Sequence, residues 1–278
     1  MNTYILLIMK LQNLSGSLLL ILLTVVFTAC SDNEREPYYL SLSVDKCEAP
    51  IGRNSYIPIL SGNGDYAIKV ANNEIVEAKA DFSTYPNMAF GVIRIQSKQK
   101  GETIVTVTDN ITRDVKTLKV KVTDNFVGFR ITESDHQALS KERWVYLVDN
   151  EWKDAYFFEK GNNGIRGLLA HGSYQFTVES SIPYLTLYYS ESNGQFTDAT
   201  IAPVPHKFNI KDNKEVTFNL LSYMLHVDWG TLGAFTKMQY TRTSVTVPVY
   251  MRMKAEGTDK VVTAVYDYNY IPQGVLQD

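Results

Sequence analysis

The chain has 278 residues, of which 45% are hydrophobic, and its formal net charge is −3. That length accommodates one large or two ordinary domains with hydrophobic cores. The slightly acidic balance argues against nucleic-acid binding, because that function needs a basic face to neutralise phosphates.

An apolar run at residues 18–29 directly precedes Cys30. The run suits the hydrophobic region of a secretory signal and is shorter than the roughly 20 residues of a transmembrane helix, which is the alternative interpretation. Thr28-Ala29-Cys30 resembles the end of a bacterial lipoprotein signal, with Phe27 where that family usually has leucine. The resemblance implies a lipid on Cys30 and contact with a membrane through that lipid. Met9-Lys10 would supply a positive start to the signal, so both Met1 and Met9 are candidate first residues.

Four segments are expected: a signal peptide at 1–29, a lipidated tether at 30–37, one domain at 38–124 and another at 125–278. The acidic residues of the tether also resemble the segment that sends Bacteroidetes lipoproteins to the outer face of the outer membrane, although a solvated linker explains them equally well. With Cys30 lipidated, Cys47 would have no disulfide partner. Cys47 is therefore interpreted as a buried apolar residue, with a reactive thiol as the alternative.

Residues 38–124 show the period of two that is typical of strands with one buried face. Seven strands are predicted, at 39–44, 55–60, 66–70, 75–80, 90–96, 103–108 and 115–122, which is the count and spacing of an immunoglobulin-like sandwich. The runs Ser61-Gly62-Asn63-Gly64-Asp65-Tyr66 and Gly101-Glu102-Thr103-Ile104-Val105-Thr106-Val107-Thr108-Asp109 resemble the bacterial Ig-like repeats of Bacteroidetes surface lipoproteins. The resemblance implies a sandwich fold and no particular chemistry.

Residues 125–278 are predicted to form a second β-rich, sandwich-like domain of unknown family. Strands are expected at 126–132, 143–148, 155–159, 173–178, 184–190, 215–220, 241–254 and 260–271, the last two as a terminal hairpin. Pro248 suggests an edge position or a bulge in that hairpin. Residues 134–142 fit either helical turns or a loop, and 220–227 fit either a buried strand or a short helix.

No sequence motif indicates a metal site, a cofactor or a catalytic nucleophile. The four histidines are widely spaced, and His226-Val227-Asp228 is more simply a structural histidine beside a surface acid. The glycine-rich run at 161–167 lacks the ending of a phosphate-binding loop and is interpreted as a flexible turn. Paired carboxylates of a glycoside hydrolase can lie far apart in sequence, and the available ones are Glu133, Asp135, Glu151 and Asp154.

Aromatic residues are concentrated after residue 125, where all three tryptophans lie. Aromatic faces suit stacking on sugars or burial in a protein partner, but they also fill β-structured cores. Trp152 is the best candidate for exposure because charged residues flank it on both sides. Tyr188 and Tyr189 should face opposite sides of one strand, and Trp144 completes the set of candidate ligand-binding residues.

These patterns together predict a lipid-anchored, non-enzymatic protein of the cell envelope that binds or adheres, with the C-terminal domain recognising a glycan or a protein. One alternative is a hydrolase that acts on polysaccharide. Another is a subunit of a fimbria-like surface assembly, in which an exposed strand edge accepts a partner strand.

Overall fold

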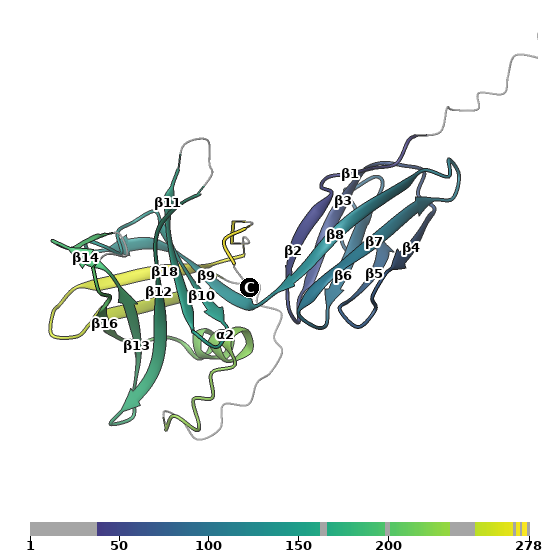
Figure 1. Cartoon of the computed structure of the whole chain (residues 1–278). Coiled ribbons are helices and arrows are strands. Elements are labelled where there is room, and N and C mark those ends of the chain that lie inside the picture. Colours follow the sequence, from purple (N-terminus) through teal and green to yellow (C-terminus); the bar gives the residue numbers. More distant parts are fainter. Residues whose placement is uncertain are drawn as a thin grey trace, which may run out of the picture.

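Two β-structured units make up the chain in the computed structural model, which describes residues 38–161, 166–197, 201–233, 248–268, 271–272 and 274–276. The first is a sandwich of two four-stranded sheets and the second is a closed eight-stranded barrel, which Figure 1 shows next to each other. The predicted all-β, multi-domain fold is confirmed, although the second unit is a barrel and not sandwich-like. The predicted signal, the tether and Cys30 lie outside the described residues.

The sandwich holds the orders β1-β3-β6-β5 and β2-β8-β7-β4 in its two sheets. Its first two strands divide between the sheets, since β1 pairs with β3 while β2 pairs in parallel with β8. The strands are β1 Ser41–Leu42, β2 Lys46–Pro50, β3 Asn54–Ser61, β4 Tyr66–Val70, β5 Val76–Asp81, β6 Val92–Ser97, β7 Gly101–Asp109 and β8 Val115–Thr123. Each of the seven predicted strands overlaps an observed one. The strand that the sequence pattern missed is β2, which lacks β-branched residues and ends in proline.

Aliphatic side chains fill the sandwich core, among them Ile93, Ile95, Val105 and Leu118, all at 0% exposure. Cys47 joins them with 7% of its surface exposed. Burial, and secondarily the charge of Glu48, raises the pKa of Cys47 to about 12, which disfavours the thiolate that a reactive cysteine needs. The interpretation of Cys47 as a buried apolar residue is confirmed.

The barrel strands follow one another in sequence around the closed sheet, and β18 pairs with β9 to complete it. A two-stranded pair, β14 Glu191–Ser192 and β15 Gln195–Phe196, lies outside that sheet. The barrel strands are β9 Asn125–Ser134, β10 Arg143–Asp149, β11 Asp154–Lys160, β12 Arg166–Glu179, β13 Ile182–Tyr189, β16 Val204–Asn209, β17 Tyr250–Ala255 and β18 Val261–Asp267.

Several predictions for the second unit need correction. Strand β12 begins at Arg166 and not near 173, and β14 to β16 were not predicted. The terminal hairpin is confirmed for β17 and β18, while residues 241–247 of its first arm lie outside the described residues. Pro248 precedes β17, and β17 pairs on both sides, so the edge interpretation is wrong for a closed sheet. Residues 135–142 form turns, which confirms the loop alternative.

Residues Glu215–Leu225 form the helix α2, although a strand was predicted at 215–220. Val216, Phe218 and Leu220 alternate as in a strand, but the residues that are buried follow the helical spacing: Thr217, Phe218, Leu221, Met224 and Leu225. His226 ends the helix in the left-handed conformation, with φ of 53°. For 220–227 the helix alternative is therefore the right one. In the part of the chain that the structure describes, no helix has the length and apolarity to cross a membrane.

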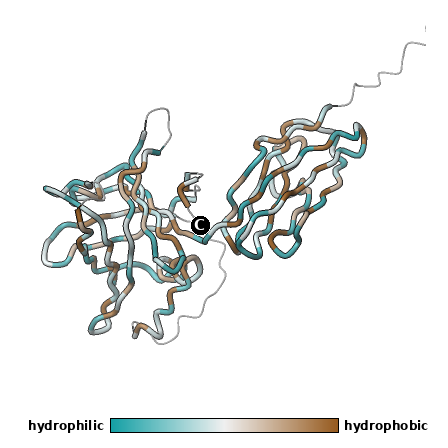
Figure 2. Tube along the Cα trace, viewed as in Figure 1, coloured by the Kyte–Doolittle hydropathy of each residue, from teal (hydrophilic) through white to brown (hydrophobic). Residues whose placement is uncertain are grey.

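The barrel interior is packed with aromatic rings and with the buried side of α2. Phe157 lies 5.1 Å from Tyr189 between ring centroids, and Trp229 packs edge-on against Phe218 at 5.2 Å. An eight-stranded barrel encloses a space that bulky side chains can just fill. Figure 2 shows the apolar stretches, in brown, lying mainly along the strands of both units.

A short junction joins the two units, because Asp124 alone separates β8 from β9. The Arg53 guanidinium, on the sandwich side, donates to the carbonyl of Phe126 and lies 4.8 Å from the centre of its ring. Ile271 and Leu276 of the C-terminal segment pack on an aromatic cluster of β9, β10 and β11. The Gly274 N–H donates to Oε1 of Glu48 at 3.0 Å, so this segment also contacts the sandwich.

Candidate ligand-binding groove

The hairpin of β10 and β11 carries Trp152 at its tip, where 75% of the side chain is exposed. Two reciprocal hydrogen bonds close the turn: the Asn150 side-chain amide donates to Asp154 Oδ2 at 2.6 Å, and the Asp154 N–H donates to Asn150 Oδ1 at 3.0 Å. Lys153 adopts a left-handed φ of 49°, which such a tight connection requires. The predicted exposure of Trp152 is confirmed, and the turn that presents it is ordered by its own side chains.

The end of β10 next to this turn is tied to the end of α2. Asp149 accepts from the Lys153 ammonium at 2.6 Å and contacts Nδ1 of His226, the residue that ends the helix. His226 and Asp228 both follow the helix and do not share a strand. Asp228 instead accepts from the N–H and hydroxyl of Thr231, and these hydrogen bonds lower its pKa. Trp152 therefore stands on a turn that is held by its own side chains and by the contact of Asp149 with His226.

A groove of about 780 Å³ opens beside Trp152, a volume within the range of about 300–1,000 Å³ that is usual for ligand sites. We call it the Trp152 groove. Three parts of the chain supply its lining, which consists of Asn150, Glu151, Trp152, Asp154, Tyr156, Leu168, His171 and Ser173 from the barrel, Lys100 and Asp124 from the sandwich and linker, and Gly274 and Val275 from the C-terminal segment.

The barrel wall of the groove contains a stacked pair, His171 on Tyr156, with ring centroids 4.5 Å apart and planes 9° from parallel. Nε2 of His171 lies 2.8 Å from Asp154 Oδ1, which holds the imidazole in place. Burial, and then the charge of Asp154, raises the pKa of Tyr156. About half of the His171 side chain, 52%, remains exposed. Leu168, which also lines the groove, adds an exposed apolar surface.

Three carboxylates are among the polar groups of the groove. Asp124 forms an ion pair of 3.0 Å with Lys100, whereas Glu151 forms no ion pair with any residue that the structure describes. Asp154 is bound by Asn150 and His171. Carboxylate oxygens accept hydrogen bonds, so the groove combines exposed ring faces with acceptors suited to hydroxyl groups.

The other three candidate residues do not line this groove. Trp144 is 8% exposed, donates its indole N–H to Asp267 Oδ2 at 2.6 Å, and lies under the Arg166 guanidinium. Tyr189 faces the barrel interior and stacks on His206 with centroids 3.8 Å apart, while Tyr188 faces outward and donates to Gln175 Oε1. The prediction of opposite faces is confirmed. Trp144 and Tyr189 have structural contacts, which leaves Trp152 as the candidate residue in the groove.

Sequence reasoning missed the residues that line the groove together with Trp152. Tyr156 and His171 meet because β11 pairs with β12 at that position, and β12 was predicted to begin only after His171. Of the carboxylates singled out for hydrolysis, Glu151 and Asp154 line the groove, and Glu133 and Asp135 do not. Among the described residues, no three histidine, cysteine or acidic side chains are grouped as metal ligands.

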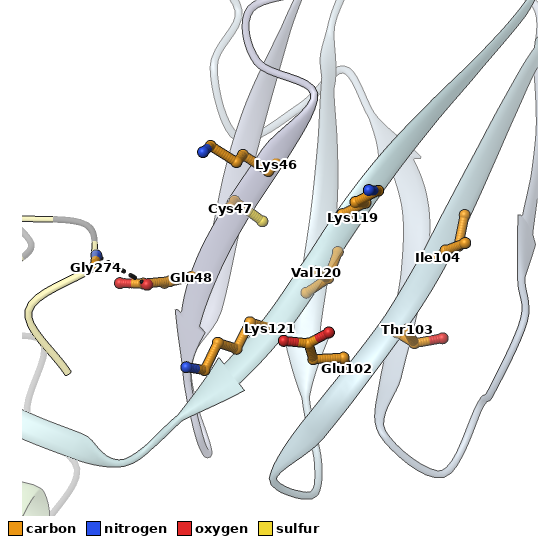
Figure 3. Close-up of a pocket in the computed structure, with 10 residues that line it drawn as sticks. All are labelled: Lys46, Cys47, Glu48, Glu102, Thr103, Ile104, Lys119, Val120, Lys121 and Gly274. Atoms are coloured by element: carbon orange, nitrogen blue, oxygen red, sulfur yellow. Dashed lines mark hydrogen bonds between the residues drawn. The ribbon is translucent and has the colours of Figure 1, made fainter. Parts of the chain in front are cut away.

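A second depression, of about 580 Å³, lies on the outer face of the sandwich sheet that contains β2, β8 and β7. Figure 3 shows its charged side chains rising from these three strands and Gly274 bonded to Glu48 at one side. Gly274 lines both depressions, so the C-terminal segment borders each of them. We call this depression the sandwich-face depression.

The chain matches no protein-family model and no curated protein. Among solved structures, one match is to domains 5–6 of the S-layer protein SbsC, at 11% identity and a TM-score of 0.25, over 82% of this chain and 95% of that one. A TM-score of that size does not indicate a shared fold, so nothing about function follows from it.

Proposed function

We propose that the protein is a non-enzymatic binding protein of the cell envelope and that its Trp152 groove binds a glycan. The observation that carries this proposal is Trp152 itself, 75% exposed at the edge of a groove and held on an ordered turn. Exposure of an indole ring to water is unfavourable, so covering it with a ligand is favoured. A rigidly held indole also loses little conformational entropy when a ligand stacks on it.

The chemistry around Trp152 fits sugar better than it fits an apolar protein anchor. Sugar rings offer apolar C–H faces for stacking and hydroxyl donors around their rims. In the groove, Trp152 and His171 supply ring surfaces, while Glu151 and Asp154 supply acceptors. A protein hot spot would instead centre on a desolvated apolar pocket.

Two of the three groove carboxylates favour binding over hydrolysis. Asp154 is held by Asn150 and His171, and Asp124 by Lys100. Each is thus fixed as a hydrogen-bond acceptor. A hydrolase needs one carboxyl group that is kept protonated as the acid and a second that faces the bond to be cleaved.

A glycan array probed with the full mature chain tests the proposal. We expect binding to a defined set of saccharides, and we expect Trp152→Ala to weaken it about fivefold or more, since one stacking contact contributes roughly 1 kcal/mol or more. Tyr39→Ala is the matched control, because Tyr39 is 76% exposed and lies on the sandwich.

Three results would contradict this function. One is the absence of saccharide binding. Another is binding that survives Trp152→Ala unchanged. The third is release of new reducing ends from a bound oligosaccharide, which would favour the hydrolase.

The membrane attachment is a second part of the proposal, and it rests on the sequence before residue 38. Lipidation of Cys30 would tether the sandwich by its N-terminal end, so the barrel would extend furthest from the membrane. Cys30→Ser should move the protein from the membrane fraction to the soluble fraction. Protease treatment of intact cells would then decide between the surface and the periplasmic face.

A further inference from the structure

The sandwich-face depression contains two neighbouring rows of side chains with different charge balance. In the first row, the strand register places Lys121 between Glu48 on β2 and Glu102 on β7. This row alternates in sign, and cross-strand pairs of opposite charge stabilise a sheet.

The second row lacks any acid. Here the register places Lys119 between Lys46 on β2 and Ile104 on β7. Both lysines are exposed, Ile104 is 44% exposed, and neither ammonium forms an ion pair with a residue that the structure describes. Figure 3 shows this row above the first row, with Gly274 bonded to Glu48 of the first row.

Two like charges placed directly opposite each other destabilise a sheet. Lys69 on β4, opposite Thr106, is exposed as well and also lacks an ion pair among the described residues. The other sheet of the sandwich offers a comparison, because its cationic pair, Lys79 and Arg94, lies near Glu77. Lys98 has the largest effect in lowering the pKa of Glu77, and the charges of Arg94 and Lys79 lower it further. The acids nearest to Lys46 and Lys119 on this face are Glu48 and Glu102 of the first row, and both already lie opposite Lys121. Three ammonium groups therefore face two carboxylates, and an anion from outside the chain would balance the remaining positive charge.

The row is also aligned with the Trp152 groove. Asp124 and Lys100 line that groove, and Lys121 and Lys119 follow back along β8. The five residue steps from Asp124 to Lys119 span about 17 Å of strand. Gly274 borders both depressions, so a single extended ligand can pass along the C-terminal segment from one to the other.

We infer that the ligand is an acidic oligosaccharide of several units, with neutral rings in the Trp152 groove and a carboxylate, sulfate or phosphate group at Lys46 and Lys119. This inference rests on the proposed function. The two ends of the surface differ in the charge that they accept: carboxylates outnumber ammonium groups beside Trp152, whereas the row of Lys46, Lys119 and Ile104 is cationic and partly apolar. A short neutral saccharide would occupy the first end alone.

The test compares oligosaccharides of increasing length in four matched forms: neutral, uronate-containing, sulfated and phosphorylated. We expect the long anionic forms to bind about tenfold or more tightly than neutral ones, and added salt to reduce that advantage. The double variant Lys46→Gln/Lys119→Gln should remove the advantage and leave unchanged the affinity for short neutral forms, which occupy the Trp152 groove alone. Comparison of the anionic forms identifies which group is recognised.

The matched control is Lys79→Gln/Arg94→Gln, which removes the same charge from the opposite sheet and should leave binding unchanged. Equal binding of long neutral and long anionic forms would overturn the inference, and so would an anionic preference that survives the Lys46/Lys119 variant. Anionic binding that withstands Trp152→Ala at full strength would overturn it as well, because the two ends would then act independently. Failure of the proposed function looks different: no saccharide of any charge would depend on Trp152.

Discussion

The sandwich and the barrel are both antiparallel β structures for the most part, but they fill their cores with different residues. The sandwich core is aliphatic, with Cys47 as its one sulfur-containing member, whereas the barrel core contains Phe, Tyr and Trp rings together with a helix. Two packed sheets leave a layer about 10 Å thick, which Val, Ile and Leu fill, while an eight-stranded barrel encloses a wider space.

This difference changes the meaning of the aromatic residues after position 125. Most of them are there because a closed barrel needs bulky side chains inside it, and others, such as Trp144 and Tyr146, anchor the C-terminal segment outside it. Aromatic content alone therefore says little about ligand binding in this chain. Trp152 is informative because neither core uses it.

The largest expected effect concerns the contribution of the aromatic core to the stability of the barrel. Phe157→Ala should destabilise the barrel by about 3–5 kcal/mol, because the ring is 1% exposed and leaves a cavity beside Tyr189. Urea unfolding followed by near-ultraviolet circular dichroism, which reports on the barrel aromatics, would measure it. A loss below about 1 kcal/mol would mean that the interior is loosely packed.

A somewhat smaller effect is expected outside the barrel, where Asp267 accepts from the Trp144 indole and forms an ion pair of 2.9 Å with Arg166. Asp267→Asn should cost about 3 kcal/mol, because it leaves the mostly buried Arg166 charge beside a neutral group. Asp259→Asn is the control, since its ion pair with Lys254 is fully exposed at the carboxylate. Equal melting temperatures for the two variants would show that the outer cluster does not depend on the charge pair.

The two units should also differ in the pH range in which they lose stability. Burial lowers the pKa of His206, and burial followed by the charge of His206 lowers that of His136, so the folded barrel disfavours protonation of both. The contribution of the two neutral histidines to barrel stability is complete above about pH 6.5 and is lost as pH falls below that value. The free energy of unfolding then falls by at most about 1.4 kcal/mol per pH unit for each histidine.

In the sandwich the corresponding group is Asp81. The hydrogen bonds that Asp81 accepts from Thr84 and Ser83 hold its pKa far below the usual range. The contribution of Asp81 to sandwich stability is therefore present above about pH 3.9 and is lost only in stronger acid. Unfolding measured against pH should therefore show the barrel weakening first. His136→Asn/His206→Asn should flatten the barrel curve, and an unchanged curve would assign the pH dependence to other groups.

The smallest predicted effect concerns the cationic row of the sandwich. Lys119→Gln should raise sandwich stability by about 0.2–1 kcal/mol, because it relieves the repulsion from Lys46 across the strand pair. Thermal unfolding without ligand at low salt would detect it. A loss of stability would show that Lys119 has a structural role, and the charge argument for an anion would then weaken.

Much of the fold could be predicted because strands with one buried face leave a period of two in the sequence. The helix α2 was missed where Val216, Phe218 and Leu220 imitate that period. Barrel closure was missed because it depends on the pairing of β18 with β9, which are distant in sequence, and no local pattern encodes it.

The candidate site was predictable only in part. Charged neighbours on both sides of Trp152 indicated its exposure, which is a local property. The walls of the groove come from three distant parts of the chain, and the contact of His171 with Tyr156 and Asp154 depends on strand register. Such contacts have no signal in a single sequence.

The parallel pairing of β2 with β8 has a mechanical consequence. The two strands run in the same direction, from the pair Lys46 and Lys119 to the pair Pro50 and Thr123. A pull on the chain before β2 and an opposite pull through β9 would therefore slide the two strands past each other. The hydrogen bonds of that ladder are then loaded together in shear, whereas a hairpin pulled at its open end would lose them one at a time. We therefore expect the sandwich to resist tension applied between the chain before β2 and the barrel.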